Sequence, residues 1–332
     1  MPLDPRAAAL LAMLHRIDAP RLHELPVEVA RRSFYKLMYA YREEPEAVSA
    51  VTDIEIPRRE HAGGPLLARV YRPAGALPGV ALPVMLWLHG GGWTLGDLAS
   101  YDPWCRALAN VCDVAVLALD YRLAPEYQFP AGVDDAWFAL KWLVREAPRL
   151  HLDADGISVG GDSAGGTLAA VLALMARDAG GPALRHQLLI YPATDLMSEF
   201  ESARRYGAGH FLERETMLWF QHNYFARELE KFDWRASPAL AASHAGLPPA
   251  LVITAECDPL ADDGAAYAEK LKAAGVAARH LQFEGMVHGF VTMFKLFAET
   301  RVALNEIAAA LRAARMTQGR PTPPLHETQE LS

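Results

Sequence analysis

Cysteine is scarce in this chain of 332 residues, with three in all. An odd number argues against a disulfide framework, and no His/Cys pair stands at an interval suited to a metal site. We therefore expect Cys105, Cys112 and Cys257 to be small buried side chains in a reducing compartment. Neither a metal nor a cofactor is expected.

Long apolar runs and a basic excess are also missing. No run approaches the ~20 residues that span a bilayer. Residues 1–15 lack an apolar core behind a basic start, so we expect no signal peptide and a cytoplasmic protein. The net charge of −8 argues against a nucleic-acid partner, which would require a basic patch.

The most informative motif present is the hexapeptide GDSAGG at 161–166. A short apolar run precedes it at 156–159 and a long one follows at 167–175, which predicts a strand, a tight turn and a helix. Such a turn strains the backbone of its serine and exposes the hydroxyl, and a Cβ at the flanking glycines would clash with neighbouring backbone. Ser163 is therefore a candidate nucleophile.

A second motif, HGGGW at 89–93, directly follows the apolar run at 84–88, which is typical of a buried parallel strand. Three consecutive glycines let the backbone approach a ligand and point N–H groups at it. Acyl transfer needs such donors because its tetrahedral intermediate carries a negative oxygen, and each donor can contribute ~3 kcal/mol. The N–H of Ala164, at the positive end of the following helix, is a further candidate.

A serine nucleophile needs a base and an acid that orients the base. His288 is the candidate base, because it closely follows a segment at 281–283 that alternates like an edge strand. Asp258 is the candidate acid, because it follows the apolar run at 250–254, and ligand sites in open α/β sheets lie outside the carboxyl ends of the strands. Four other carboxylates remain alternatives: Asp195, Glu256, Asp262 and Asp263.

Further motifs accompany these: DYRLAPE at 120–126, YP at 191–192, DPL at 258–260 and HGF at 288–290. The combination, from about 54 to 311, resembles the hormone-sensitive-lipase-like family of carboxylesterases (bacterial family IV) in the α/β-hydrolase superfamily. The resemblance is to the branch with an aspartate, here Asp162, before the serine.

The resemblance assigns roles to particular residues and implies that His89 braces the glycine loop. It implies a catalytic triad of Ser163, Asp258 and His288, and an oxyanion hole of Gly91, Gly92 and Ala164.

The activity that the resemblance implies is that of a serine carboxylesterase, which hydrolyses short- to medium-chain acyl esters through an acyl-enzyme and needs no cofactor. An amidase or deacetylase of the same fold is the alternative among enzymes, because a triad does not itself choose between ester and amide. A non-catalytic ligand-binding receptor is the alternative of another class. Receptors of this resemblance lack the catalytic histidine, whereas His288 is present.

Strands and helices alternate along the chain, and continuous apolar strands predict a mostly parallel sheet with helices on both faces. The resemblance implies the α/β-hydrolase fold, with eight strands and a helical cap. We expect a cap segment at 1–48, a catalytic domain at 49–316 with a cap insertion at about 197–235, and a flexible tail at 317–332. The apolar strand and helix over 279–314 are a candidate homodimer interface.

Aromatic side chains cluster at helical spacing in both expected cap segments. One interpretation is a cap that forms the substrate pocket, and the other is plain packing between helices. Under the first interpretation the candidate pocket residues are Trp93, beside the glycine loop, and Phe34, Tyr35, Phe211 and Trp219.

Overall fold

The computed structural model describes residues 3–58 and 64–317. Within this part of the chain, eight strands form one sheet in the order β1-β2-β4-β3-β5-β6-β7-β8. β2 pairs antiparallel with β1 and with β4, and the remaining neighbours are parallel. The predicted eight-stranded, mostly parallel sheet is therefore confirmed. The strands are β1 (Ala50–Ile56), β2 (Leu66–Arg72), β3 (Leu82–Leu88), β4 (Ala115–Asp120), β5 (Leu152–Asp162), β6 (Gln187–Ile190), β7 (Ala250–Cys257) and β8 (Ala278–Val287).

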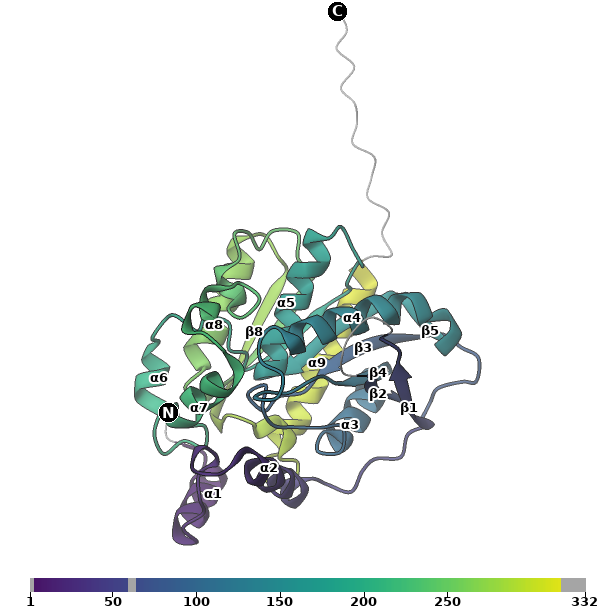
Figure 1. Ribbon diagram of the computed structural model, residues 1–332. Helices are drawn as coiled ribbons and strands as arrows, with labels where there is room; N and C mark the ends of the chain where they lie inside the picture. Colours follow the sequence, from purple (N-terminus) through teal and green to yellow (C-terminus); the bar gives the residue numbers. More distant parts are fainter. Residues whose placement is uncertain (1–2, 59–63, 318–332) are drawn as a thin grey trace, which may run out of the picture.

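Helices cover both faces of this sheet (Figure 1). On one face pack α4 (Ala131–Glu146), α5 (Ala164–Asp178) and α8 (Ala261–Ala273), and on the other α3 (Asp102–Cys112) and α9 (Glu299–Thr317). Nearly every side chain of β3 and β4 is buried, because both faces are covered. Since β3 and β5 to β8 run parallel, their carboxyl ends meet at one edge, and the sequence motifs gather there.

Two helical segments lie outside the sheet layers. The N-terminal one holds α1 (Pro5–Arg16), the 3₁₀ turn η1 (Leu22–Glu24) and α2 (Val27–Tyr41), at one end of the molecule (Figure 1). The second, between β6 and β7, holds α6 (Glu201–Tyr206) and α7 (Arg214–Tyr224), and α7 packs on η1. The other 3₁₀ turns are η2 (Pro148–Leu150), η3 (Glu228–Phe232), η4 (Pro238–Leu240) and η5 (Phe290–Thr292).

The N-terminal segment is fastened at both ends to chain that flanks the candidate base. The N–H of Asp4 donates to the carbonyl of Gly285 (3.0 Å), three residues before His288. Behind α2, the carbonyl of Tyr41 accepts the N–H of Lys295 (3.0 Å). These helices therefore lie against the site end of the sheet.

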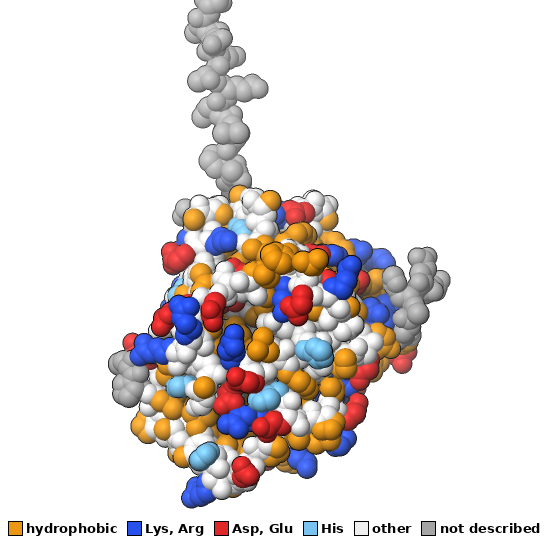
Figure 2. Space-filling view, turned by 60° about the vertical axis from the view of Figure 1, so that its left-hand side comes forward, with side chains coloured by type: hydrophobic (Ala, Val, Ile, Leu, Met, Phe, Trp, Pro, Cys, Tyr) orange, Lys and Arg blue, Asp and Glu red, His pale blue; other side chains and the backbone are white. Residues whose placement is uncertain are grey.

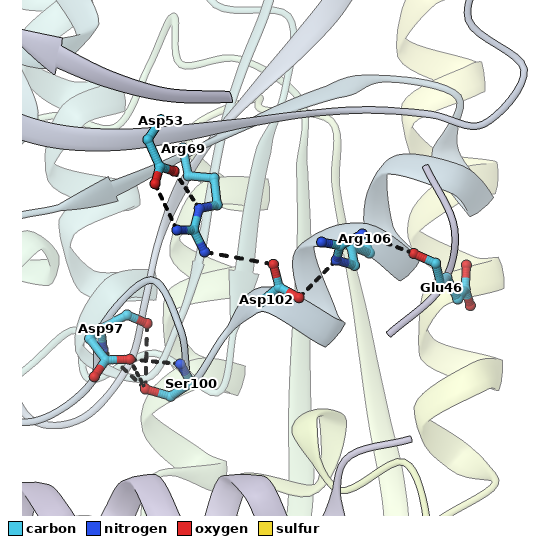
Figure 3. Close-up of polar contacts among 7 residues, drawn as sticks. All are labelled: Glu46, Asp53, Arg69, Asp97, Ser100, Asp102 and Arg106. Atoms are coloured by element: carbon cyan, nitrogen blue, oxygen red, sulfur yellow. Dashed lines mark hydrogen bonds and ion pairs between the residues drawn. The ribbon is translucent and has the colours of Figure 1, made fainter. Parts of the chain in front are cut away.

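A chain of ion pairs ties the linker after α2 to the sheet (Figure 3). The Arg69 guanidinium of β2 binds Asp53 of β1 and lies 3.8 Å from Asp102, which begins α3. Asp102 in turn accepts from Arg106 (2.7 Å), whose second nitrogen donates to the carbonyl of Glu46 (3.2 Å). Charged groups thus help to fix the entry of the chain into the sheet.

On the face shown in Figure 2, acidic and basic side chains are interspersed rather than gathered by sign. Cys105, Cys112 and Cys257 are buried and form no disulfide, as expected. Across residues 3–58 and 64–317, no helix is both long and apolar enough to cross a membrane. The expected tail at 317–332 lies outside the described residues apart from Thr317, where α9 ends.

Candidate active site

Ser163 stands in the sharp turn between β5 and α5. Its φ of 53° and ψ of −123° are a combination that L-residues rarely adopt, and this is the strain that the sequence predicts. The turn needs its glycines, because a Cβ on Gly165 would collide with the carbonyl oxygen of Leu88. The N–H of Ser163 donates to the carbonyl of Ile190 (2.8 Å), which ties the turn to β6.

Two hydrogen bonds join this serine to the predicted base and acid. The Oγ of Ser163 lies 3.0 Å from Nε2 of His288, and Nδ1 of His288 lies 2.7 Å from Oδ2 of Asp258. An ionised carboxylate can only accept, so Nδ1–H donates to Asp258 and Nε2 accepts the serine hydroxyl. Asp258 is fully buried, and its second oxygen accepts the N–H of Leu260 (2.9 Å). The base is thus held in the tautomer that can take a proton from Ser163.

The alternative acids are engaged elsewhere. Asp195 accepts N–H groups from its own turn, including that of Ser198 (3.1 Å). Asp262 accepts from the start of α6, Asp263 from the loop that precedes Asp195, and Glu256 from a backbone N–H near the end of β8. Asp258 is therefore the member of this set that bonds His288.

Hydrogen bonds to its carbonyls set the direction of the glycine loop's N–H groups. The carbonyl of Gly90 accepts from Nδ1–H of His89 (2.8 Å), and that of Gly91 accepts from the N–H of Thr94 (3.1 Å). In a trans peptide the N–H points away from the C=O, so these bonds direct the N–H groups of Gly91 and Gly92 to the opposite side of the loop. Burial lowers the pKa of His89, which keeps its ring neutral.

Asp162, next to the candidate nucleophile Ser163, connects the turn between β5 and α5 to the glycine loop. Its carboxylate accepts the N–H of Gly90 (2.8 Å) and the hydroxyl of Tyr101 (2.9 Å). Burial raises the pKa of Asp162 to about 6. The sequence marked this residue only as a sign of the family branch, because its partner Gly90 lies 72 positions away along the chain.

Comparison with known proteins agrees with this geometry. Residues 85–292 match the family model described as "alpha/beta hydrolase fold". The chain belongs to the α/β-hydrolase family, in its hormone-sensitive-lipase-like branch. It is 38% identical to the ethyl acetate hydrolase of Pseudomonas putida, over 94% of this chain and 99% of the relative. It is 40% identical to the carboxylic ester hydrolase LipN of Mycobacterium tuberculosis, over 94% and 83%.

Solved structures of other α/β-hydrolases superpose closely on this one. An ester hydrolase from the metagenome of Lake Arreo, complexed with a derivative of bipyridine phosphonate, has a TM-score of 0.90 at 37% identity and covers 95% of this chain and 99% of its own. The hyperthermophilic esterase of the archaeon Pyrobaculum calidifontis has a TM-score of 0.86 at 41% identity, with the same coverage.

In this α/β-hydrolase the candidate triad opens into a largely apolar cavity of about 120 Å³. The predicted oxyanion donors Gly91, Gly92 and Ala164 line it beside Ser163 and His288. Half of its remaining lining residues come from the two helical segments. The N-terminal segment contributes Leu22, Phe34, Leu37 and Met38, and the second contributes Phe211, Leu212, Thr216, Met217, Phe220 and Gln221.

The predicted pocket residues divide into two groups. Trp93, Phe34 and Phe211 line the cavity, whereas Tyr35 and Trp219 are not among its lining residues. Tyr35 is exposed, because it follows Phe34 by about 100° around α2. Trp219 is turned away in the same manner and packs against the core, while its neighbour Phe220 lines the cavity.

Helix α7 presses directly on the glycine loop of this hydrolase, a contact that sequence reasoning missed. A Cβ on Gly92 would collide with the ring of Phe220. The next residue, Trp93, stacks on Tyr224 with ring centroids 4.4 Å apart and planes 5° apart. Aromatic pairing between distant segments has no periodic signal in the sequence, because the rings of α7 could equally pack on other helices.

Proposed function

We propose that this protein is a serine carboxylesterase in which Ser163 attacks the ester carbonyl. The single observation that carries the proposal is the hydrogen-bonded chain from Ser163 through His288 to the buried Asp258. Membership of the α/β-hydrolase family and ester-hydrolysing relatives over nearly the whole chain support it.

The geometry gives each step a group to perform it. His288 takes the proton of Ser163 as the hydroxyl attacks, and Asp258 stabilises the imidazolium that forms. The negative oxygen of the tetrahedral intermediate is stabilised by the N–H groups of the oxyanion hole, proposed as Gly91, Gly92 and Ala164. His288 then gives its proton to the leaving alcohol. Water activated by the same histidine releases the acid.

The nucleophile is tested by covalent labelling. An aryl phosphonate should modify Ser163, mapped by mass spectrometry of the intact protein and its peptides, and S163A should not be labelled. A phosphonate derivative is the compound complexed with the Lake Arreo relative. Labelling of S163A to the same extent would remove the assignment.

The acyl preference that we propose is for short- to medium-chain esters. The cavity is narrow and its walls are mostly apolar, which suits a short hydrocarbon chain better than a charged or bulky acyl group. A series of p-nitrophenyl esters from acetate to palmitate should peak below about ten carbons. The matching p-nitroanilides test the amidase alternative. Equal turnover of the anilide and the ester would favour an amidase.

We further propose that residues 1–48 and 197–235 form a cap over a catalytic domain at 49–316. Both segments supply walls of the cavity above Ser163, while the triad stands on strands and their turns. A cytoplasmic location is also proposed, and three unpaired buried cysteines support it. A homodimer through β8, which ends the sheet, is proposed with light scattering after gel filtration as its test.

A further inference from the structure

Arg31, on the N-terminal helix α2, reaches two loops that belong to the catalytic domain. Its Nε donates to the carbonyl of Thr94 (3.0 Å), and its Nη2 donates to the carbonyl of Ala124 (3.0 Å). The two terminal nitrogens also bind the Glu126 carboxylate, each at 2.7 Å. One side chain thus engages four acceptor atoms on two separate loops.

Thr94 is one of the residues that hold the glycine loop in shape. Its N–H donates to the carbonyl of Gly91 (3.1 Å) and its hydroxyl to the carbonyl of Gly92 (3.0 Å). The first bond fixes the peptide plane that carries the N–H of Gly92, a proposed oxyanion donor. The second bond fixes the peptide plane that follows it. The Thr94 carbonyl that Arg31 bonds shares its peptide plane with the N–H of Leu95, which also donates to the carbonyl of Gly91 (2.8 Å). A rotation of that plane therefore passes to the glycine loop.

The second loop, 121–126, supports the glycine loop at two points. The hydroxyl of Tyr121 donates to the carbonyl of His89 (2.7 Å), and the N–H of Ala124 donates to the carbonyl of Trp93 (2.8 Å). Arg31 donates hydrogen bonds both to this loop and to Thr94, so it links the two loops to each other.

The ion pair itself contributes little energy. The side chain of Arg31 is 24% exposed and that of Glu126 46%, and solvent-exposed ion pairs add little to stability. The planar fork of the guanidinium is what Lys could not replace, since it meets two carbonyls and a carboxylate at once. Its contribution is therefore geometric.

We infer that Arg31 is a positioning residue for the oxyanion hole, through which the N-terminal segment sets the rate of the chemical step and not only the choice of substrate. The inference rests on the proposed esterase function. It adds to the cap a role in transition-state stabilisation that acts through the carbonyls of Thr94 and Ala124.

The test compares R31M, R31K and E126Q with R32M in the full-length protein. Arg32 is the next residue of α2 and is exposed, which makes it a matched control. R31M should lower kcat roughly tenfold, a fraction of the 10²–10³-fold lost with a whole oxyanion donor, with KM nearly unchanged. R31K should recover part of this rate, and E126Q should lose about threefold because the two carbonyl bonds remain.

Two further readouts separate positioning from a change in pocket shape. Phe34 lies one turn from Arg31 and lines the cavity, so an effect through Phe34 would vary with acyl length. An effect on the oxyanion hole should be equal for acetate and octanoate. Affinity for an aryl trifluoromethyl ketone, whose adduct places an oxyanion in the hole, should fall by the same factor as kcat.

The inference is overturned if kcat of R31M stays within twofold of R32M, or if the loss depends on acyl length. If R31M melts far below R32M, R31K decides in its place, because it keeps the charge but not the planar fork that meets both carbonyls. The kcat of R31K should then still lie below that of R32M, and an equal kcat would overturn the inference. An inactive parent protein would instead mean that the proposed esterase function is wrong, which keeps the two failures distinct.

Discussion

Two helices of equal length illustrate how differently the two parts of the molecule are held. Both α5 and α2 have 15 residues, yet α5 buries twelve of them and α2 only Ala30 and Met38. The sheet with α3, α4, α5, α8 and α9, here called the platform, is held by dense apolar packing. The helical segments at 3–48 and 197–235, here called the cover, rely on polar contacts and a few apolar side chains.

The surface of the cover also shows that its apolar side chains are less completely buried than those of the platform. Large apolar side chains remain exposed on it, among them Tyr35, Tyr39, Leu218, Leu229 and Phe232. A close-packed platform transmits small displacements, because interiors have few voids to absorb them. Changes in the platform should therefore act on the chemistry. Changes in the cover should act on which substrate fits, except where the cover touches the glycine loop.

The largest effect that this comparison predicts lies in the platform. D258N should lower kcat about 10⁴-fold, because the amide would favour the wrong tautomer of His288. The dependence on acyl length should stay the same, since no wall of the cavity changes. Steady-state kinetics over the ester series measures both. D195N is the control and should keep most of its activity, because the carboxylate of Asp195 accepts N–H groups of its own turn. The opposite pattern would reverse the assignment.

The next effect lies where the cover joins the platform. Asp263 of α8 is buried and accepts from the N–H of Thr194 (2.8 Å), where the second cover segment leaves β6. Burial raises the pKa of Asp263 to about 7, from an ordinary value of 3.8. Between about pH 4 and 7 the native state thus binds more protons than the unfolded one, and the free energy of unfolding falls as pH rises.

D263N removes this titration, since an amide does not ionise. The stability of the variant relative to the parent should therefore rise from pH 4 to 7, by at most about 1.4 kcal/mol per pH unit. Urea unfolding at several pH values in this window measures the difference. Parallel pH profiles for the two proteins would mean that Asp263 titrates alike in both states.

The smallest effect is expected within the cover. F34A should enlarge the cavity and raise the ratio of kcat/KM for octanoate over acetate roughly fivefold, or about 1 kcal/mol for a half-buried ring. Its neighbour Tyr35 is exposed and outside the cavity, so Y35A should leave the ratio within twofold. Equal shifts in both variants would show that α2 acts on selectivity through its general packing and not through Phe34.

Most of the platform could be predicted from the sequence. Continuous apolar runs predicted β3, β4 and β7, and local turn chemistry predicted the strained serine. The acid and base could be ranked because parallel strands bring their carboxyl ends to one edge. Each of these inferences uses residues that are close in sequence or related by a simple rule of the sheet.

The contacts of the cover could not be predicted from the sequence as well, because they join segments that are far apart in the chain and share no repeating pattern. Helical spacing placed Phe34, Tyr35, Phe220 and Trp219 on helices but could not tell which of each pair faces the cavity. That depends on how far each helix is rotated about its axis, which the tertiary packing sets. The bonds from Arg31 to Thr94 and Ala124 span 63 and 93 positions, and carbonyl acceptors leave no trace in the sequence.

The backbone of Ser163 has a consequence for redesign of the protein. A non-glycine residue held at positive φ costs about 1–3 kcal/mol, and at Ser163 the fold bears that cost continuously, with or without substrate. Glycine adopts the same angles freely, so S163G should unfold at a higher temperature than the parent although it cannot form an acyl-enzyme. Any selection for thermostability alone would therefore drift toward an inactive protein at this position, and an activity screen must accompany it.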